Sequence, residues 1–275
     1  MTSDPGGLAV LERRISAYAR ETQQSAGPVR VTVAQVVVAQ ALPSALVKGG
    51  SGMKFRLGTK FTRGSKDLDV AWREEQEEFA TQMRSALESG WGPFRGQLVA
   101  KSQRPHPGVP DSYIMQPYVV RLTAYRKSFA TVVLEVGYDD LGATTDGSGE
   151  TILSSDITAM FTALGLPEPT PVAILAVHHQ IAQKIHACTE PGSERAHDLV
   201  DLQLLWPTED SDKELVAQTT RRLFAFRRGH VFPGKCRVGP TWSSAYSEAA
   251  RGLAVEADVN VAAEWLNGRL AEMAI

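Results

Sequence analysis

The sequence has little cysteine, no long apolar segment and no excess of charge of one sign. Its 275 residues include two cysteines, Cys188 and Cys236, which are not spaced as a Cys-x-x-Cys pair. A disulfide framework is therefore not expected, and a reducing cytoplasm is the simplest setting. The N-terminus lacks the basic-then-apolar order of a signal peptide, and no apolar run is long enough to span a bilayer. We expect a cytoplasmic protein without a membrane partner.

The balance of charge and apolar residues is that of an ordinary globular protein. The formal net charge is −2, and 43% of the residues are apolar. This composition allows one large hydrophobic core or two modest ones. The charge excludes a chain coated in basic residues, but a local basic patch is enough to bind nucleic acid. A nucleic-acid partner therefore stays open.

Apolar spacing predicts an α/β (α+β) fold, with a mixed β-sheet core in residues 1–166 and a mainly helical region in residues 167–275. In the first region we expect helices over 8–22, 30–42, 74–89 and 155–164, with a further helix beginning at Ser51. The expected strands cover 45–48, 67–72, 98–101, 113–125 and 129–136, and a polar loop covers 139–150. The expected C-terminal helices cover 172–188, 194–206, 211–228, 241–254 and 258–273, with a strand near 172–175 as an alternative.

Two glycines and two spaced acids form the most informative motif. Gly49, Gly50 and Ser51 follow an expected strand, and Asp67 and Asp69 lie on the next one. Residues i and i+2 of a strand share a face, so the two carboxylates point the same way and repel unless a cation lies between them. Glycines let backbone N–H groups approach a phosphate at a helix N-terminus. The alternative is a glycine turn followed by a solvated strand end.

Nucleotidyl transfer would use these residues in a definite way. It requires in-line attack on an α-phosphate while metal ions neutralise the charge of the departing pyrophosphate. Carboxylates are the ligands that Mg²⁺ prefers, so Asp67 and Asp69 are the expected ligands of a two-metal Mg²⁺ site. The backbone of residues 49–51 and the Ser51 hydroxyl are expected to hold the phosphates of an NTP substrate.

A second cluster lies in the C-terminal region. Lys184 interrupts an apolar helical stretch, where a lysine is costly unless it reaches a phosphate or a carboxylate. Asp198 and Asp201 are three residues apart and share one helical face. The cluster predicts either a contact to a substrate phosphate or a Lys–Asp ion pair between adjacent helices.

These motifs resemble those of the AbiEii-type nucleotidyltransferases, toxin components of bacterial toxin–antitoxin and phage-defence systems. The resemblance covers Lys-Gly-Gly-Ser and Arg63-x-Ser65-x-Asp67-Leu-Asp69 within residues 46–70. It continues with Lys184-Ile and Arg195-x-x-Asp198-Leu-x-Asp201-Leu within residues 178–205, in the expected order. One departure is His197, where the family usually has lysine, and this leaves a charged role at that position open.

The resemblance implies roles for individual residues. Asp67 and Asp69 correspond to the metal-binding acids, Gly50 and Ser51 to the phosphate-binding turn, and Ser65 to a position at the mouth of the active site. Lys184 corresponds to the lysine that contacts the triphosphate, and Asp198 to an additional acid that could act as the general base. Because these last two residues come from the helical region, that region is expected to complete the active site.

The resemblance also implies an acceptor and a partner. Family members with an assigned substrate add nucleotides to the 3′ end of tRNA and so block translation, and a cognate antitoxin protein is expected. A small-molecule nucleotidyltransferase of the aminoglycoside-modifying kind is the alternative enzyme, and a non-catalytic nucleotide-binding protein is the alternative outside enzymes. Ser65 lies beside the acids, so a phosphate attached there would repel an NTP.

An arginine-rich segment and a group of histidines complete the candidates. The segment Arg221–His230 interleaves four arginines with two phenylalanines, which suits RNA or a triphosphate, and Arg227 is the expected nucleotide contact. The alternative is a helix that buries Leu223 and Phe226 beneath solvated arginines. A zinc site matches no standard spacing among His178, His179, His186, His197 and Cys188.

Overall fold

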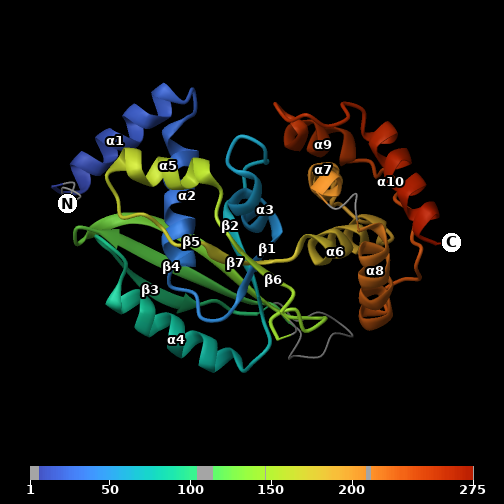
Figure 1. Ribbon diagram of the computed structural model, residues 1–275, viewed down its shortest axis with the longest axis horizontal. Coiled ribbons are helices and arrows are strands. Elements are labelled where there is room, and N and C mark those ends of the chain that lie inside the picture. The colour runs from blue at the N-terminus through green and yellow to red at the C-terminus, as the bar shows by residue number, and fades with distance from the viewer. Residues whose placement is uncertain (1–5, 104–113, 146, 209–211, 275) are drawn as a thin grey trace. The chain divides into compact units, whose positions relative to one another are not determined.

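The computed structural model describes residues 6–103, 114–145, 147–208 and 212–274. The chain divides into two compact units, each described here by itself (Figure 1). Unit 1 comprises residues 1–59, 64–139 and 144–174, and unit 2 comprises residues 60–63, 140–143 and 175–275. Tyr113 and Ser211, the first residues of an expected strand and an expected helix, lie outside the described residues.

Unit 1 is built on a mixed sheet, which confirms the expected fold class. The strand order is β3-β4-β5-β2-β1-β7-β6. β2 is central, parallel to β5 on one side and antiparallel to β1 on the other, and β1 pairs in parallel with β7. The strands are β1 (Leu46–Lys48), β2 (Asp67–Trp72), β3 (Phe94–Ala100), β4 (Gln116–Ala124), β5 (Lys127–Tyr138), β6 (Gly149–Ile152) and β7 (Val172–Leu175).

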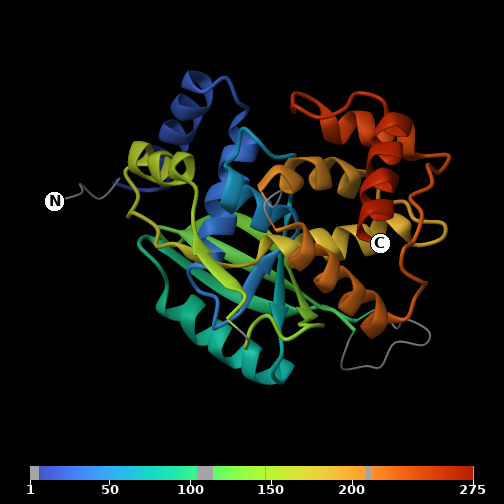
Figure 2. The ribbon, with the colours of Figure 1, turned by 45° about the vertical axis from the view of Figure 1, so that its right-hand side comes forward.

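One face of this sheet is covered by helices. Side chains of β2 alternate, so that Leu68 and Val70 are buried in the core whereas Asp67 and Asp69 belong to the other face. The helices that share this core are α1 (Leu8–Glu21), α2 (Ala26–Ala39), α4 (Gln76–Ser89) and α5 (Ser155–Leu164), and α3 (Gly49–Leu57) adds Phe55. α1 packs beside α2 and α5, and α4 packs against β3, the strand that comes after it in the chain (Figures 1 and 2). The acidic residues therefore lie on the face opposite to the apolar core.

Helix α3 (Gly49–Leu57) follows β1 without a loop. The expectation that a helix begins at Ser51 is wrong, because α3 begins at Gly49 and no side chain caps it. Gly49 adopts a φ of 62°, a conformation that glycine reaches without steric cost, and this lets the chain turn directly from strand to helix. Ser51 consequently lies inside the first turn and is fully buried.

The described part of unit 2 is mainly helical. α6 (Val177–Thr189) packs against α7 (Ala196–Leu205) and α8 (Lys213–Arg227), and α7 packs against α9 (Trp242–Ala250). A 3₁₀ turn (Trp206–Thr208) follows α7, and α10 (Val259–Met273) contacts α7, α8 and α9.

Several expected boundaries differ: β3 begins at Phe94 rather than at residue 98, α2 covers Ala26–Ala39 rather than 30–42, and α9 ends at Ala250 rather than at residue 254. The segment 172–188 splits into β7 and α6 at Ala176, whose backbone is extended, so the strand alternative is correct. β6 occupies the end of the expected polar loop. In the described ranges, no helix combines the length and apolar character needed to cross a membrane.

Candidate functional site

Three adjacent strands bring a cation and two carboxylates into one row. Lys48 on β1 is paired with Asp69 on β2, and Asp69 is paired with Glu135 on β5. Residues opposite one another on neighbouring strands place their side chains on the same face. Asp67 shares that face because it lies two residues before Asp69. The structure thus brings together the two acids that the spacing predicts, and it adds a third.

Glu135 is the residue that the sequence analysis missed. It lies on β5, more than sixty residues after Asp69 along the chain, and joins it through the parallel pairing of β2 with β5. The signal in the sequence was a single acid within an otherwise apolar stretch, residues 132–136. Nothing in that stretch shows which strand will lie beside it, so only the fold identifies the partner.

The carboxylates crowd one another electrostatically. Burial raises the pKa of Glu135 to about 7, together with the charge of Asp69, a hydrogen bond to Asp69 and the charge of Asp67, while Lys48 acts in the opposite direction. Burial and the charge of Asp69 also raise the pKa of Asp67, against the influence of Lys66. Both shifts arise first from burial and then from neighbouring negative charge, and a bound cation would counter both.

These carboxylates fit a divalent cation by their chemistry. In the part of the chain that the structure describes, no three His, Cys, Asp or Glu side chains are gathered as a ready metal cage. Instead, Glu135 and Asp69 share a hydrogen bond, which uses oxygens that would otherwise face a cation. Carboxylate oxygens are the ligands that Mg²⁺ prefers. Asp67 and Asp69, with Glu135, are the side chains that would hold it.

Gly49 lies against this row of charges. A Cβ at position 49 would stand 2.2 Å from Oδ2 of Asp69, so any other residue would displace that carboxylate. Gly49 and Gly50 open α3, and the first N–H groups of a helix have no partner within it. The start of α3 is therefore suited to an anion that also contacts a cation at Asp69.

A buried polar network holds the backbone of Asp67 in place. The carbonyl oxygen of Asp67 accepts hydrogen bonds from Gln35 Nε2 at 3.1 Å, Ser51 Oγ at 2.5 Å and Ser65 Oγ at 3.2 Å. The carbonyl oxygen of Ser65 accepts from Gln35 Nε2 at 3.2 Å and from Lys54 Nζ at 3.1 Å. Lys54 Nζ also donates to Gln35 Oε1 at 2.7 Å. Residues of α2 and α3 thereby fix the start of β2.

Ser51 and Ser65 are both part of this hydrogen-bond network. Both hydroxyl groups donate to the Asp67 carbonyl, so their protons are engaged within the protein. Ser51 is also inaccessible to solvent, whereas Ser65 is partly exposed. The predicted phosphate contacts of Ser51 and Ser65 stay predictions, and the observed role of both side chains is to anchor the strand that carries the acids.

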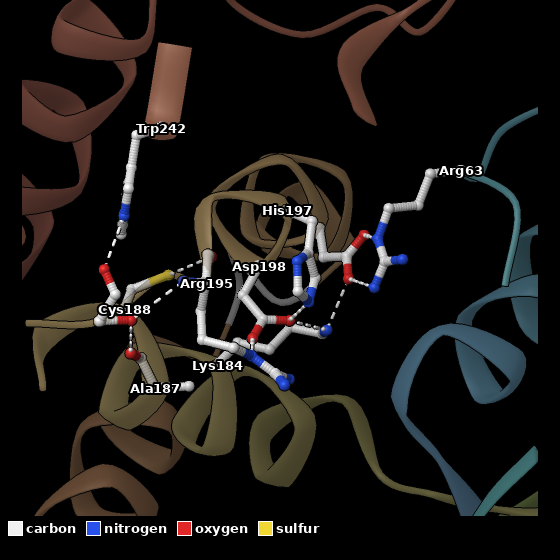
Figure 3. Close-up of polar contacts among 10 residues, drawn as sticks. Arg63, Lys184, Ala187, Cys188, Arg195, His197, Asp198 and Trp242 are labelled. Carbon is white, nitrogen blue, oxygen red and sulfur yellow. Dashed lines mark hydrogen bonds and ion pairs between the residues drawn. The ribbon is translucent and has the colours of Figure 1, made fainter. Parts of the chain in front are cut away.

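Lys184 lies within a network of charges in unit 2 (Figure 3). Its Nζ atom lies 2.8 Å from Oδ1 of Asp198 and 2.6 Å from Oδ2 of Asp201, and both carboxylates are buried. Arg63 donates from Nε and Nη2 to Asp201 at 3.0 Å each, and Arg195 Nε donates to Asp198 at 2.8 Å. Both buried carboxylates are therefore bound on two sides by cations.

The electrostatics of this network keep Lys184 protonated and Asp198 ionised. Burial alone would lower the pKa of Lys184, but the charges of Asp198 and Asp201 outweigh it and raise that pKa. Burial likewise acts to raise the pKa of Asp198, whereas Lys184 and Arg195 hold it well below its usual range. A carboxylate with so low a pKa is a weak proton acceptor. The geometry is that of the ion-pair alternative, and the catalytic roles of Lys184 and Asp198 stay predictions.

Comparison with known proteins decides the family. The sequence of residues 33–265 matches the family described as nucleotidyl transferase AbiEii toxin, type IV toxin–antitoxin system. The match extends over most of the chain and includes both units. The chain belongs to this family.

Two solved structures resemble this AbiEii chain. MenT4, a nucleotidyltransferase toxin from Mycobacterium tuberculosis, superimposes with a TM-score of 0.52 at 18% identity, over 97% of this chain and 99% of that one. JHP933 from Helicobacter pylori gives a TM-score of 0.43 at 18% identity, over 88% of each chain. At such identity, the likeness to MenT4 establishes the fold alone. No curated protein matches the sequence significantly.

The other candidate residues of this AbiEii protein, Arg227, His186 and Cys188, interact with neighbouring groups of the protein itself. Nε of Arg227 donates to Asp140 at 2.9 Å, so the expected nucleotide contact already has a carboxylate partner. Burial, Arg227 and His230 lower the pKa of His186 to about 4, which keeps it neutral. Burial is also the first cause of the raised pKa of Cys188, a thiol that donates to the Arg195 carbonyl (Figure 3). In the described residues no cluster of zinc ligands occurs.

Proposed function

We propose that this protein is an Mg²⁺-dependent nucleotidyltransferase toxin that transfers NMP from an NTP to the 3′ end of tRNA and thereby inhibits translation. The observation that carries the proposal is the row of carboxylates on the open face of β2 and β5, beside the glycine start of α3. Family membership supplies the reaction class. The choice of tRNA rests on the resemblance to family members with that acceptor.

The carboxylates prepare the site for the chemistry. Mg²⁺ in a site of the two-metal type would supply charge neutralisation at the phosphates. Asp67 and Asp69 would hold it, and Glu135, which shares a hydrogen bond with Asp69, would be a further ligand in its ionised form. Gly49 and Gly50 let the start of α3 approach the phosphates. Gln35 and Ser51 keep the Asp67 backbone in register with the sheet.

The proposed roles of Lys184, Asp198 and Arg227 come from the resemblance and the sequence. For Lys184 to contact a triphosphate, its ammonium would have to leave at least one of two buried carboxylates. For Asp198 to act as general base, its pKa would have to rise, which requires the loss of a cationic neighbour. A substrate phosphate that draws Lys184 away from Asp198 would produce both changes together.

The partner expected for such a toxin is a cognate antitoxin. The family is described as belonging to type IV toxin–antitoxin systems, which supports an antitoxin that opposes the toxin's activity. Phosphorylation of Ser65 remains one way in which an antitoxin could act, because the added charge would lie two residues from Asp67. Mass spectrometry of the protein co-expressed with an adjacent antitoxin gene would detect it.

The reaction and the acceptor can be tested in one assay. The purified protein is incubated with each α-³²P-labelled NTP and Mg²⁺, with total tRNA in one series and aminoglycosides in another. We expect label in the tRNA, lost on addition of excess chelator and absent in the Asp67→Asn variant. Label only in the drug would replace the tRNA proposal by the small-molecule alternative. Absence of transfer in both series, with nucleotide binding retained, would favour a non-catalytic binding protein.

A further inference from the structure

The side chain of Lys48 crosses the central strand and ends over the neighbouring one. Lys48 belongs to β1 and Gly137 to β5, and β2 lies between them. A Cβ built on Gly137 would nevertheless stand 2.9 Å from Nζ of Lys48 and 3.7 Å from its Cε. The whole length of the lysine side chain is therefore laid across β2, and its ammonium rests on the backbone of β5.

This position lies among the carboxylates. Lys48 is opposite Asp69, Asp69 is opposite Glu135, and Gly137 follows Glu135 by two residues, which places it on the same face of β5. The ammonium is therefore on the carboxylate face, next to Glu135. Its neighbours on that face are the side chains that would hold the metal ion of the proposed reaction.

Gly137 provides the space for this ammonium. The backbone of Gly137 does not adopt a positive φ, so its conformation is open to any residue. What glycine supplies here is the absence of a side chain, because the nearest atoms to an added Cβ are Nζ and Cε of Lys48. A glycine within a strand often marks such a close approach.

The charges of the site match one divalent ion. When ionised, Asp67, Asp69 and Glu135 carry three negative charges, and Lys48 leaves two of them uncompensated. One divalent cation neutralises the remainder. A second one would have to bind to a neutral site beside an ammonium group, where like charges repel.

We propose that Lys48 is a built-in cation of the carboxylate site, seated in the space left by Gly137, and that in the nucleotide-free protein it occupies the position a second divalent ion would need. The nucleotide-free protein then binds one divalent ion. This inference rests on the assignment of Asp67 and Asp69 as metal ligands in the proposed function. It differs from a purely structural ion pair, which would affect stability but not metal binding.

The test is a titration of the nucleotide-free protein with Mn²⁺, followed by electron paramagnetic resonance of the free ion. We expect the wild type to bind one Mn²⁺ per chain in this site. Lys48→Met, which keeps the apolar stem, should bind Mn²⁺ roughly tenfold more tightly because the repelling charge is gone. Gly137→Ala should change the affinity in the same direction but less, since its methyl group displaces the ammonium without removing it.

The matched control is Lys127→Met. Lys127 is exposed at the start of β5, so this variant removes one positive charge from the same strand but away from the carboxylates. Its Mn²⁺ affinity should equal that of the wild type. A thermal unfolding curve for each variant confirms that the protein is folded at the temperature of the titration.

The possible results separate this inference from the proposed function. Two Mn²⁺ ions bound to the wild-type site, or equal affinity in the wild type and Lys48→Met, would overturn the role of Lys48 alone. No Mn²⁺ binding by the wild type, or binding that Asp67→Asn leaves intact, would overturn the metal assignment and this inference with it. Tighter binding by Lys48→Met, shared in part by Gly137→Ala and lost in Asp67→Asn, is the result that supports both.

Discussion

Gly49 and the carboxylate of Asp69 are in contact, with room for no side chain between them. A Cβ at position 49 would lie 2.2 Å from Oδ2 of Asp69, and the φ of Gly49 is 62°. The turn from β1 into α3 and the position of Asp69, a proposed metal ligand, are therefore set by the same residue. The glycine that begins the helix is also the glycine that allows Asp69 to face it.

Substitution of Gly49 by alanine should therefore reduce activity more than stability. The left-handed conformation costs alanine about 1 kcal/mol of folding free energy, whereas the displaced Asp69 carboxylate should lower kcat at least roughly tenfold, the effect of a small misplacement in a catalytic site. Gly64→Ala is the matched control, because nothing lies within 4 Å of its added Cβ. Equal activity of the two variants in the NTP transfer assay would contradict the role of Gly49.

Substitution of Glu135 by glutamine should stabilise the protein above neutral pH. The folded-state pKa of Glu135 is raised to about 7, while an unfolded glutamate titrates near 4.3. Between these values the folded protein keeps a proton that the unfolded chain releases, so stability falls as pH rises. Glu135→Gln removes this fall and should gain about 1 kcal/mol at pH 8, after allowance for solvent screening.

Urea unfolding at pH 4 and pH 8 measures this effect. The two proteins should have similar stability at pH 4, where Glu135 is largely protonated in both states. The variant should also lose transferase activity if Glu135 is a metal ligand. A variant that is less stable than the wild type at pH 8 would show that neither burial nor the neighbouring carboxylates disfavour the charged form of Glu135.

Substitution of Lys184 by methionine should unfold unit 2 more readily. The variant leaves Asp198 and Asp201 buried with fewer cationic partners, and removal of one member of a buried pair costs roughly 3–5 kcal/mol. Asp198 has a lowered pKa, so its stabilising effect is present above pH of about 4 and is lost as pH falls below that. The raised pKa of Lys184 keeps its contribution present until the pH exceeds about 10.

The stability difference between Lys184→Met and the wild type should therefore be largest between these limits and should shrink in acid. Lys213→Met, at the exposed start of α8, is the control for loss of a charge. If Lys184→Met keeps wild-type stability but loses transferase activity, the ion-pair interpretation is wrong and the contact with triphosphate is favoured.

Local spacing was sufficient for some of the site and insufficient for the rest. Asp67 and Asp69 could be predicted because the two-residue period of a strand decides which side chains share a face. Glu135 could not, since its place beside Asp69 depends on the parallel pairing of β2 with β5. The same limit applies to Ser51, whose hydroxyl has a donor role that only the packing of α3 on β2 discloses.

Helix α2 could also be predicted from local sequence features. The apolar run 30–42 could be a strand or a helix by composition, and its length together with the following proline decided correctly for a helix. For Lys184, in contrast, the sequence was not sufficient. Its burial among apolar residues indicated an anionic partner, but the sequence does not distinguish a substrate phosphate from Asp198 and Asp201, because both would satisfy the same charge.

Substitution of Gln35 by leucine should weaken the site without touching a carboxylate. Gln35 is fully buried, its Nε2 donates to the carbonyl groups of Ser65 and Asp67, and its Oε1 accepts from Lys54. Leucine leaves these three partners without this side chain, at a cost of about 1–3 kcal/mol in unfolding free energy for buried polar groups.

The loss should also appear in metal binding. Because the start of β2 is released from α2, the Asp67 carboxylate is less well placed, and the Mn²⁺ affinity of the nucleotide-free protein should fall roughly tenfold. The control is Gln82→Leu on the exposed side of α4, which should leave both stability and Mn²⁺ affinity unchanged. A Gln35→Leu variant that is destabilised yet binds Mn²⁺ like the wild type would limit Gln35 to a structural role. A loss of Mn²⁺ affinity at temperatures where the variant is fully folded would show that Gln35 positions Asp67.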